Sequence, residues 1–200
     1  MRGSMMNYLP SVFLGLLVLG ISSQAAAQDA PAVELSGGYN YLKGTIPPHN
    51  DSVSFAAGWY ADVAITVPQP KKMMAVVLQV GASPKTHEGS EANLRLFMAG
   101  IRLNKRMQRT VLFVHTLFGN TNSKFGNVTP TARSAGFDEW TGFFTEQYGG
   151  GVNVMASEKV GLHLGADYLR VHGKHDSTIL NEGFNMVRIV AGIVLPFGTR

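Results

Sequence analysis

The feature that most constrains this chain is a strict alternation of side-chain character along unusually long runs of residues. The segment VGLHLGADYLRV, residues 160–171, shows it: Val160, Leu162 and Leu164 fall on one parity, and small or polar residues fall on the other. A period of two is the pattern of a β-strand with one apolar face. That face either packs on the core of a soluble sheet or contacts lipid on the outside of a membrane barrel.

Eight such runs follow one another, and each has 11 to 16 residues. They cover residues 32–43, 52–67, 73–85, 93–103, 109–120, 143–155, 159–172 and 185–195. Strands of soluble proteins have about 5 or 6 residues, whereas a tilted crossing of a bilayer needs about 9 to 11 in the apolar zone. The runs therefore predict an all-β fold that crosses a membrane with eight strands.

The connections between these runs alternate in length. The second, fourth and sixth runs end in the short turns PQPKK, NKRMQ and ASE. The first, third, fifth and seventh are followed by GTIPPHND, THEGSEA, residues 121–142 and GKHDSTILNEGF. Tight periplasmic turns and longer external loops are the arrangement of an outer-membrane barrel. The sequence thus predicts an eight-stranded antiparallel up-and-down transmembrane β-barrel.

The N-terminal segment predicts export. Arg2 precedes an apolar stretch at residues 11–21, and the small residues Ala25 and Ala27 follow, which is the pattern of a cleaved secretory signal. The apolar stretch is short for a transmembrane helix. We therefore expect residues 1–27 to be removed.

Composition narrows the class of the remaining domain, residues 28–200. The sequence has no Cys, which excludes a disulfide scaffold and a thiolate metal site. Its net charge of +4 is modest, and no Lys/Arg cluster is longer than Lys71-Lys72. A nucleic-acid partner is therefore not expected.

The polar parity indicates which face contacts lipid. It carries charges of both signs but is rich in Gly, Ala and Ser, which suits the crowded interior of an eight-stranded barrel better than a surface in water. We therefore expect these residues to face lipid: Val33, Leu35, Tyr39, Tyr41, Val53, Phe55, Trp59, Val63, Ile65, Val67, Val187, Ile189, Ala191, Ile193 and Leu195. These are expected to face inward: Glu34, Ser36, Asn40, Ser54, Ala56, Tyr60, Asp62, Thr66, His163, Asp167 and Arg188.

The fourth and fifth runs leave their facing open. In NLRLFMAGIRLN, either Arg95 or Arg102 faces inward, or a bulge between them turns both inward. In the fifth run, His115 accompanies Val111 and Phe113 inward if the other parity faces lipid.

The inward charges predict a buried network. Its expected members are Glu34, Asp62, Arg95, His115, His163, Asp167 and Arg188. One interpretation is that they neutralise one another and fix the register of the strands, since an unpaired charge there costs several kcal/mol. The other is a narrow polar path or a gated channel. We favour the first, because eight strands leave an interior filled by side chains and no wide pore.

Several segments resemble a known family. GGGVNVMASEKVGLHLGADYLRV and NMVRIVAGIVLPFG look like the last three strands of small bacterial outer-membrane β-barrel proteins of the OmpA-like, porin-family type. LFVHTLFGN resembles their fifth strand and VELSGGYNYL their first. The resemblance implies location in the bacterial outer membrane, contact with its lipid and lipopolysaccharide, and insertion by the barrel-assembly machinery. Such chains commonly end on an aromatic residue, whereas here Phe197 is followed by Gly-Thr-Arg.

Two candidate chemical sites share the last long connection. His172, His175 and Asp176 offer imidazole and carboxylate ligands for a divalent metal, although a solvated loop is the favoured interpretation. His175, Ser177 and Glu182 supply the residue types of a serine hydrolase. Lipid A deacylases, which are eight-stranded outer-membrane barrels, have a similar His-x-Ser, but Thr178 stands where they usually have Asn.

Two further patterns have structural explanations. Gly149, Gly150 and Gly151 lack the following helix of a phosphate-binding loop and are expected to allow close packing in a strand. An aromatic girdle at the lipid interface is expected from Tyr39, Tyr41, Trp59, Tyr148 and Tyr168.

These observations predict an integral outer-membrane barrel with a structural or adhesive role through its external loops. We expect no enzymatic activity, and no catalytic residue, cofactor or metal site. The alternatives are a lipid-acting hydrolase resembling lipid A deacylases and a soluble periplasmic ligand-binding barrel resembling lipocalins. The sequence identifies no ligand of the loops.

Overall fold

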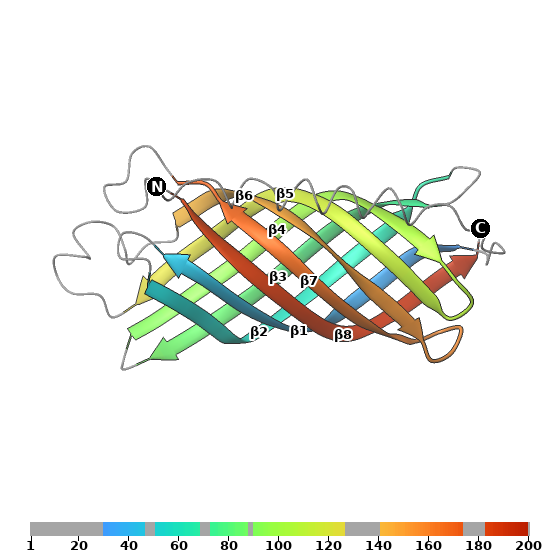
Figure 1. Ribbon diagram of the computed structural model, residues 1–200, viewed down its shortest axis with the longest axis horizontal. Helices are drawn as coiled ribbons and strands as arrows, with labels where there is room; N and C mark the ends of the chain where they lie inside the picture. Colours follow the sequence, from blue (N-terminus) through green and yellow to red (C-terminus); the bar gives the residue numbers. More distant parts are fainter. Residues whose placement is uncertain are drawn as a thin grey trace, which may run out of the picture.

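A computed structural model describes residues 30–46, 51–68, 73–87, 90–126, 141–173 and 183–199. Its strands form a closed antiparallel barrel in which each pairs with its sequence neighbours and β8 pairs with β1 (Figure 1). They are β1 (Pro31–Ile46), β2 (Asp51–Thr66), β3 (Met74–His87), β4 (Ser90–Arg106), β5 (Thr110–Gly126), β6 (Thr141–Met155), β7 (Gly161–Val171) and β8 (Phe184–Thr199). The predicted eight-stranded up-and-down barrel is confirmed, while the predicted signal segment 1–27 lies outside the described residues.

The two ends of the barrel differ. The turns that follow β2, β4 and β6 lie at one end, on the right in Figure 1, and we call this the turn end. There the amide of Val67 donates to the Met74 carbonyl at 2.9 Å, and that of Met107 donates to the Thr110 carbonyl at 2.7 Å. The connections after β1, β3, β5 and β7 leave from the opposite end, the loop end, and include residues 47–50, 88–89, 127–140 and 174–182, which are not described. The predicted long connections after the first and third strands were wrong, because β1, β2, β3 and β4 extend into them and leave only residues 47–50 and 88–89 between strands.

The outer wall of the barrel is apolar, as predicted. Leu162 is 57% exposed although it is a large aliphatic residue, and Arg188 on the inside is 0% exposed. The large apolar side chains that stand outward include Leu35, Tyr39, Trp59, Ile65, Leu78, Phe97, Ile101, Leu112, Phe118, Leu164, Tyr168, Val187, Ile189 and Ile193. A soluble monomer rarely exposes a contiguous apolar surface of this extent, whereas lipid covers it in a membrane barrel. In the described part of the chain, no helix is long and apolar enough to span a bilayer.

A bulge in β2 corrects the predicted facing of four residues. Asn40 of β1 pairs with Gly58, but Leu42 already pairs with Phe55, so two alanines of β2 oppose a single residue of β1. Such a bulge shifts the alternation by one residue. Phe55 is therefore buried in the interior at 1% exposure, and Ala56 is exposed outside. Val53 likewise packs against the buried apolar side chains, and Ser54 lies opposite the outward Lys43. The predictions that Val53 and Phe55 face lipid and that Ser54 and Ala56 face inward were wrong.

The facing of β4 and β5 is now determined. Strand β4 pairs with both neighbours in an unbroken register, so Arg95 and Arg102, which have opposite parity, lie on opposite sides of the wall. Arg102 is buried inside, and Arg95 is exposed outside, so its assignment to the inner network was wrong. On β5, Val111, Phe113 and His115 point inward as the sequence predicted.

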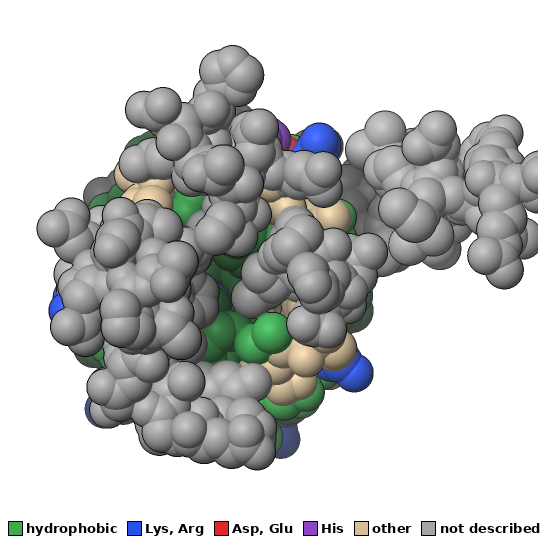
Figure 2. Space-filling model, turned by 90° about the vertical axis from the view of Figure 1, so that its left-hand side faces the viewer, with side chains coloured by type: hydrophobic (Ala, Val, Ile, Leu, Met, Phe, Trp, Pro, Cys, Tyr) green, Lys and Arg blue, Asp and Glu red, His purple; other side chains and the backbone are tan. Residues whose placement is uncertain are grey.

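The interior has an apolar region toward the loop end, which we call the apolar cluster. Figure 2, which views that end, shows hydrophobic side chains deep in the opening between the grey connections. The members contributed by the loop-side halves of the strands are Leu42, Phe55, Leu94, Leu96, Met98, Leu117, Phe143, Leu169, Val171, Phe184 and Met186. The charged residues of the interior lie between this cluster and the turn end.

Candidate functional site

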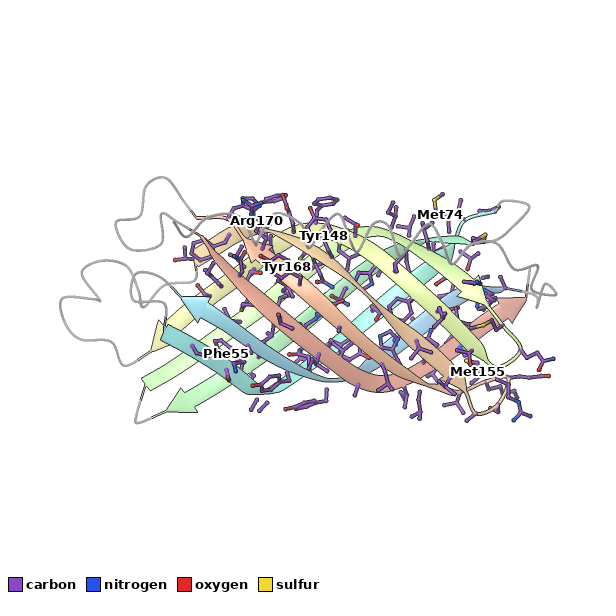
Figure 3. All side chains as sticks on the ribbon, in the orientation of Figure 1. Phe55, Met74, Tyr148, Met155, Tyr168 and Arg170 are labelled. Atoms are coloured by element: carbon purple, nitrogen blue, oxygen red, sulfur yellow. The ribbon has the colours of Figure 1, made fainter. Side chains whose placement is uncertain are left out.

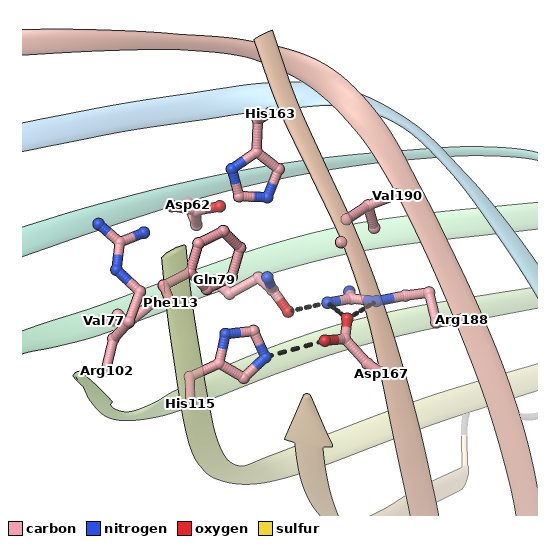
Figure 4. Close-up of a pocket in the computed structure, with 11 residues that line it drawn as sticks. Asp62, Val77, Gln79, Arg102, Phe113, His115, His163, Asp167, Arg188 and Val190 are labelled. Atoms are coloured by element: carbon pink, nitrogen blue, oxygen red, sulfur yellow. Dashed lines mark hydrogen bonds and ion pairs between the residues drawn. The ribbon is translucent and has the colours of Figure 1, made fainter. Parts of the chain in front are cut away.

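The charged interior centres on an ion pair between neighbouring strands. Asp167 of β7 lies directly opposite Arg188 of β8. Nε and Nη2 of Arg188 donate to Oδ2 of Asp167 at 2.8 and 2.6 Å (Figure 4). Nη2 also donates to Oε1 of Gln79, on β3, at 2.7 Å. Because β3 and β8 are not neighbours, this last bond crosses the lumen.

A histidine extends this pair to β5. Nε2 of His115 lies 2.9 Å from Oδ1 of Asp167, so the carboxylate is bound on both of its oxygens. The side-chain nitrogen of Gln147, on β6, lies 3.2 Å from the same ring atom. His115 thus contacts a carboxylate and an amide, and these contacts include no serine, threonine or cysteine side chain. The arrangement neutralises and orients these side chains and does not form a catalytic triad.

A second ion pair joins β1 to β4. Glu34 accepts hydrogen bonds from Arg102, through Oε2, and from Arg106, through Oε1, the latter at 2.8 Å. The guanidinium of Arg102 also lies 5.2 Å from the centre of the Phe113 ring, a cation–π contact. Since β1 and β4 are not adjacent in the barrel, the carboxylate and the two guanidiniums bridge the lumen.

His163 is held in a third cluster. Its Nδ1 lies 2.8 Å from Oδ1 of Asn153, directly opposite on β6. Its ring stacks on Phe113 at 5.1 Å and lies against Tyr60 at 5.7 Å. Position and orientation of this imidazole are therefore fixed by packing as well as by a hydrogen bond.

Between the three clusters lies a cavity of about 10 Å³. Asp62, Arg102, His115, His163 and Asp167 are among the residues that line it (Figure 4). A volume of roughly 10 to 15 Å³ accommodates a single water molecule. The cavity therefore has room for a solvent molecule but not for a substrate or cofactor.

The predicted network is largely confirmed. Glu34, Asp167 and Arg188 form buried ion pairs, and His115 joins them, while Asp62 and His163 line the central cavity. Arg106 was not among the predicted members, because the predicted strand ended at residue 103 and β4 continues to Arg106. Residues 102 and 106 have the same parity, so a longer predicted strand would have placed Arg106 on the same face as Arg102.

The candidate sites on the last connection are only partly described. His175, Asp176, Ser177, Thr178 and Glu182 lie outside the described residues, so the hydrolase and metal hypotheses are not tested there. Within the described residues, no group of three or more His, Cys, Asp or Glu side chains is arranged to hold a metal ion. His172 is described, and its Nε2 lies 3.1 Å from Oε1 of Glu146.

The glycine run has the structural role that the sequence predicted. Gly149, Gly150 and Gly151 lie within β6. A Cβ atom at Gly149 would overlap the carboxylate of Asp167 and would lie 2.7 Å from the carbonyl oxygen of Ala166. The absence of a side chain at this position therefore makes room for the central ion pair.

The aromatic residues of the predicted girdle stand on the outer wall. Tyr39, Trp59, Tyr148 and Tyr168 are exposed, and Tyr41 is partly exposed. Figure 3 shows Tyr148, Tyr168 and Arg170 together toward the loop end, with Met74 and Met155 at the turn end. The hydroxyl of Tyr148 donates to Oε2 of Glu146 at 2.9 Å. Aromatic side chains with polar contacts on their loop side are typical of the interface between lipid and headgroups.

Comparison with known proteins identifies the fold. No protein-family model matches the chain, and no curated protein sequence matches it. The structure is similar to that of Neisserial surface protein A (NspA), with a TM-score of 0.60 and 10% identity over 85% of this chain and 100% of that chain. It is also similar to Ail, the attachment invasion locus protein of Yersinia pestis, with a TM-score of 0.52 and 12% identity over 83% and 99% of the two chains.

At these identities the similarity establishes the fold alone, and the environment of the barrel is inferred from its surface. The barrel is closed, its outer wall is apolar and its charges are inside. The resemblance to small outer-membrane barrels, first noted in the sequence, is confirmed at the level of structure. The chain is therefore a closed β-barrel with the fold of these outer-membrane proteins, and its apolar wall is suited to contact with lipid.

Proposed function

We propose that this chain is a closed, non-conducting and non-enzymatic barrel that serves the cell envelope through its external connections. The observation that carries the proposal is the filled interior. Arg102 and Arg188, the two largest fully buried side chains, are 2% and 0% exposed. The ion pairs that hold them run between strands that are not neighbours, so they cross the space that a channel would occupy.

The apolar cluster closes the path a second time. An ion that passed the paired charges would next meet the side chains of Leu96, Leu117 and Leu169, all 0% exposed. Transfer of a charge into such surroundings without a partner is very costly. The paired charges and the apolar cluster together favour a structural barrel over a channel that conducts solutes.

The external connections are the remaining part on which a function can depend. The sequence provides 14 residues at 127–140 and 9 at 174–182 between strands that are otherwise tightly joined. Binding residues are commonly found on loops that a rigid scaffold holds in place. The similar structures are named as a surface protein and an attachment invasion locus protein, which favours a surface role for this chain as well.

The closed interior predicts the absence of steady conductance. Purified chain, refolded and inserted into planar lipid bilayers, is expected to leave the current at the level of the bare bilayer. A general porin in the same bilayer provides the positive control, and a shift in gel mobility between unheated and boiled samples confirms that the barrel has formed. Ohmic current steps that appear with each insertion and scale with salt would contradict the proposal.

The non-enzymatic part of the proposal predicts unchanged lipid A. Mass spectra of lipid A from cells that overproduce the chain are expected to match those from cells that carry an empty vector. Loss of an acyl chain in the overproducing cells, abolished by Ser177→Ala, would instead establish the deacylase alternative. Asn181→Ala, in the same connection but outside the His-x-Ser segment, is the matched control.

A further inference from the structure

We propose that a hollow on the outer wall, where β8 meets β1 and β7, binds the phosphorylated headgroup of an outer-leaflet glycolipid of the lipid A type. The inference rests on the outer-membrane setting of the proposed function and names a lipid partner and its place on the barrel. It concerns the outside of the wall and none of the charged groups of the interior.

The hollow has a volume of about 230 Å³ and is formed by strands that are adjacent in the barrel. Its lining includes Lys43, Ser52, Tyr168, Asn185 and Val187. In the register of the barrel, Val187 of β8 lies between Tyr168 of β7 and Lys43 of β1. The lysine and the tyrosine therefore flank the hollow from the two sides of β8, and both side chains are exposed on the outer wall.

The pairing of β2 with β3 indicates where the hydrocarbon region ends. The described ladder between them runs from Thr66↔Ala75 to Trp59↔Ala82 and stops, although β2 begins at Asp51 and β3 continues to His87. An open sheet edge does not occur in contact with hydrocarbon. The hydrocarbon therefore ends near Trp59 on this wall.

The hollow lies beyond that boundary, on the loop side. Lys43 pairs with Ser54, which precedes Trp59 on β2 and so lies closer to the loop end. Tyr168 belongs to the girdle, and Asn185 lies two residues further toward the loops than Val187. The hollow is thus at the level of the lipid headgroups. Ile189, two residues after Val187 toward the turn end, is 53% exposed and offers an apolar surface for acyl chains.

The charges around the hollow favour an anion. Lys43 lies on one side of β8, and Arg170, directly opposite Asn185, lies on the other. The described carboxylate nearest in the register is Glu146, which lies directly opposite Arg170, accepts a hydrogen bond from the Tyr148 hydroxyl at 2.9 Å and faces His172 at 3.1 Å. Lys43 lies opposite Ser54 and Val187, so its charge has no carboxylate across from it in the described register. A lysine ammonium binds phosphate as a point charge, and Asn185, Ser52 and the Tyr168 hydroxyl supply neutral donors.

The size of the hollow favours a headgroup over a whole small molecule. Sites that enclose a drug-sized ligand have roughly 300 to 1,000 Å³, and this one has about 230 Å³. It is therefore suited to a phosphosugar whose acyl chains remain in the bilayer. A phosphate group alone is the competing ligand with the same charge chemistry.

The test measures binding to the full mature chain, refolded in a neutral detergent. Native mass spectrometry would follow titration with lipid A, with enzymatically dephosphorylated lipid A and with inorganic phosphate. We expect one lipid A per barrel and binding about tenfold weaker after dephosphorylation, since the charge-assisted hydrogen bonds to the phosphate are then lost. Lys43→Gln is expected to weaken lipid A binding about three- to tenfold, while Lys43→Arg retains it.

The matched control is Arg95→Gln on β4, at the opposite side of the barrel. Arg95 is also an exposed outer-wall cation near the interface, in the row of Trp59 and Ala82. Its replacement is expected to leave the affinity unchanged. Gel mobility before and after boiling confirms that each variant has formed the barrel.

Each contrary result has its own meaning. Equal affinity of the parent and Lys43→Gln, or of lipid A with and without phosphates, would overturn the proposed site. Inorganic phosphate that competes at the same concentration as lipid A would overturn the assignment to a lipid in favour of a simple anion site. A chain that forms no barrel in detergent would overturn the proposed function itself, independently of this site.

Discussion

Replacing Arg188 by Met is expected to lower the free energy of unfolding by about 3 to 5 kcal/mol. The guanidinium makes two hydrogen bonds to Asp167 and one to Gln79, and it is completely buried. Without it, the carboxylate of Asp167 remains in the interior with only the imidazole of His115 beside it. The measurement is equilibrium unfolding by urea in phospholipid vesicles, followed by tryptophan fluorescence.

A double variant separates the effect of the uncompensated Asp167 charge from the effect of the hydrogen bonds that Arg188→Met removes. Asp167→Asn together with Arg188→Met leaves no uncompensated charge at this place, so the pair should lose less stability than the sum of the two single variants. Strict additivity, or a loss of less than about 1 kcal/mol in Arg188→Met, would show that the network does not stabilise the barrel.

The second large effect is expected from a charge on the outer wall. Leu164 lies within β7, on the turn side of the girdle residue Tyr168, and is 48% exposed. Leu164→Arg is expected to cost about 2 to 4 kcal/mol, because the guanidinium would face the centre of the bilayer. The same urea titration in vesicles measures it.

The control for this variant adds the same charge outside the lipid. Ser157 is exposed in the turn between β6 and β7, and Ser157→Arg is expected to change stability by no more than about 0.5 kcal/mol. If Leu164→Arg were equally neutral, the outer wall would lie in water. That result would favour the lipocalin-like alternative.

The number, order and facing of the strands were predictable because they depend on a local pattern. A period of two is visible in any segment of 11 to 16 residues and needs no knowledge of tertiary contacts. Thus β7 and β8 have the inward and outward residues that the sequence indicated, from His163 and Asp167 to Ile189 and Ile193.

The bulge in β2 was not predictable on the same basis. Alanine suits the lipid face and the interior equally well, so neither Ala56 nor Ala57 signals that the alternation shifts between them. The shift is defined by pairing with β1, where Leu42 meets Phe55. For this reason the facing of Phe55 was inverted while that of Trp59, two residues beyond the alanines, was correct.

The inner charges required contacts between distant parts of the sequence. Arg102 reaches Glu34 across 68 positions, and Arg188 reaches Gln79 across 109. Parity shows that Arg95 and Arg102 face opposite sides, but only the position of Glu34 across the lumen decides which is inside. The types of residue in the site were therefore predictable, whereas the identity of some members was not.

The apolar cluster at the loop end has a thermodynamic consequence. Where lipid surrounds the wall, an aliphatic side chain gains little by turning inward, since hydrocarbon is as apolar as leucine. On the loop side of Trp59 the surroundings are headgroups and water, so Phe55, Phe143 and Phe184 are stabilised there by the hydrophobic effect. That contribution weakens on cooling and carries a large heat capacity, which the embedded part of the wall does not share. The same strands therefore respond to temperature as a soluble protein at one end and as a membrane protein along the rest of their length.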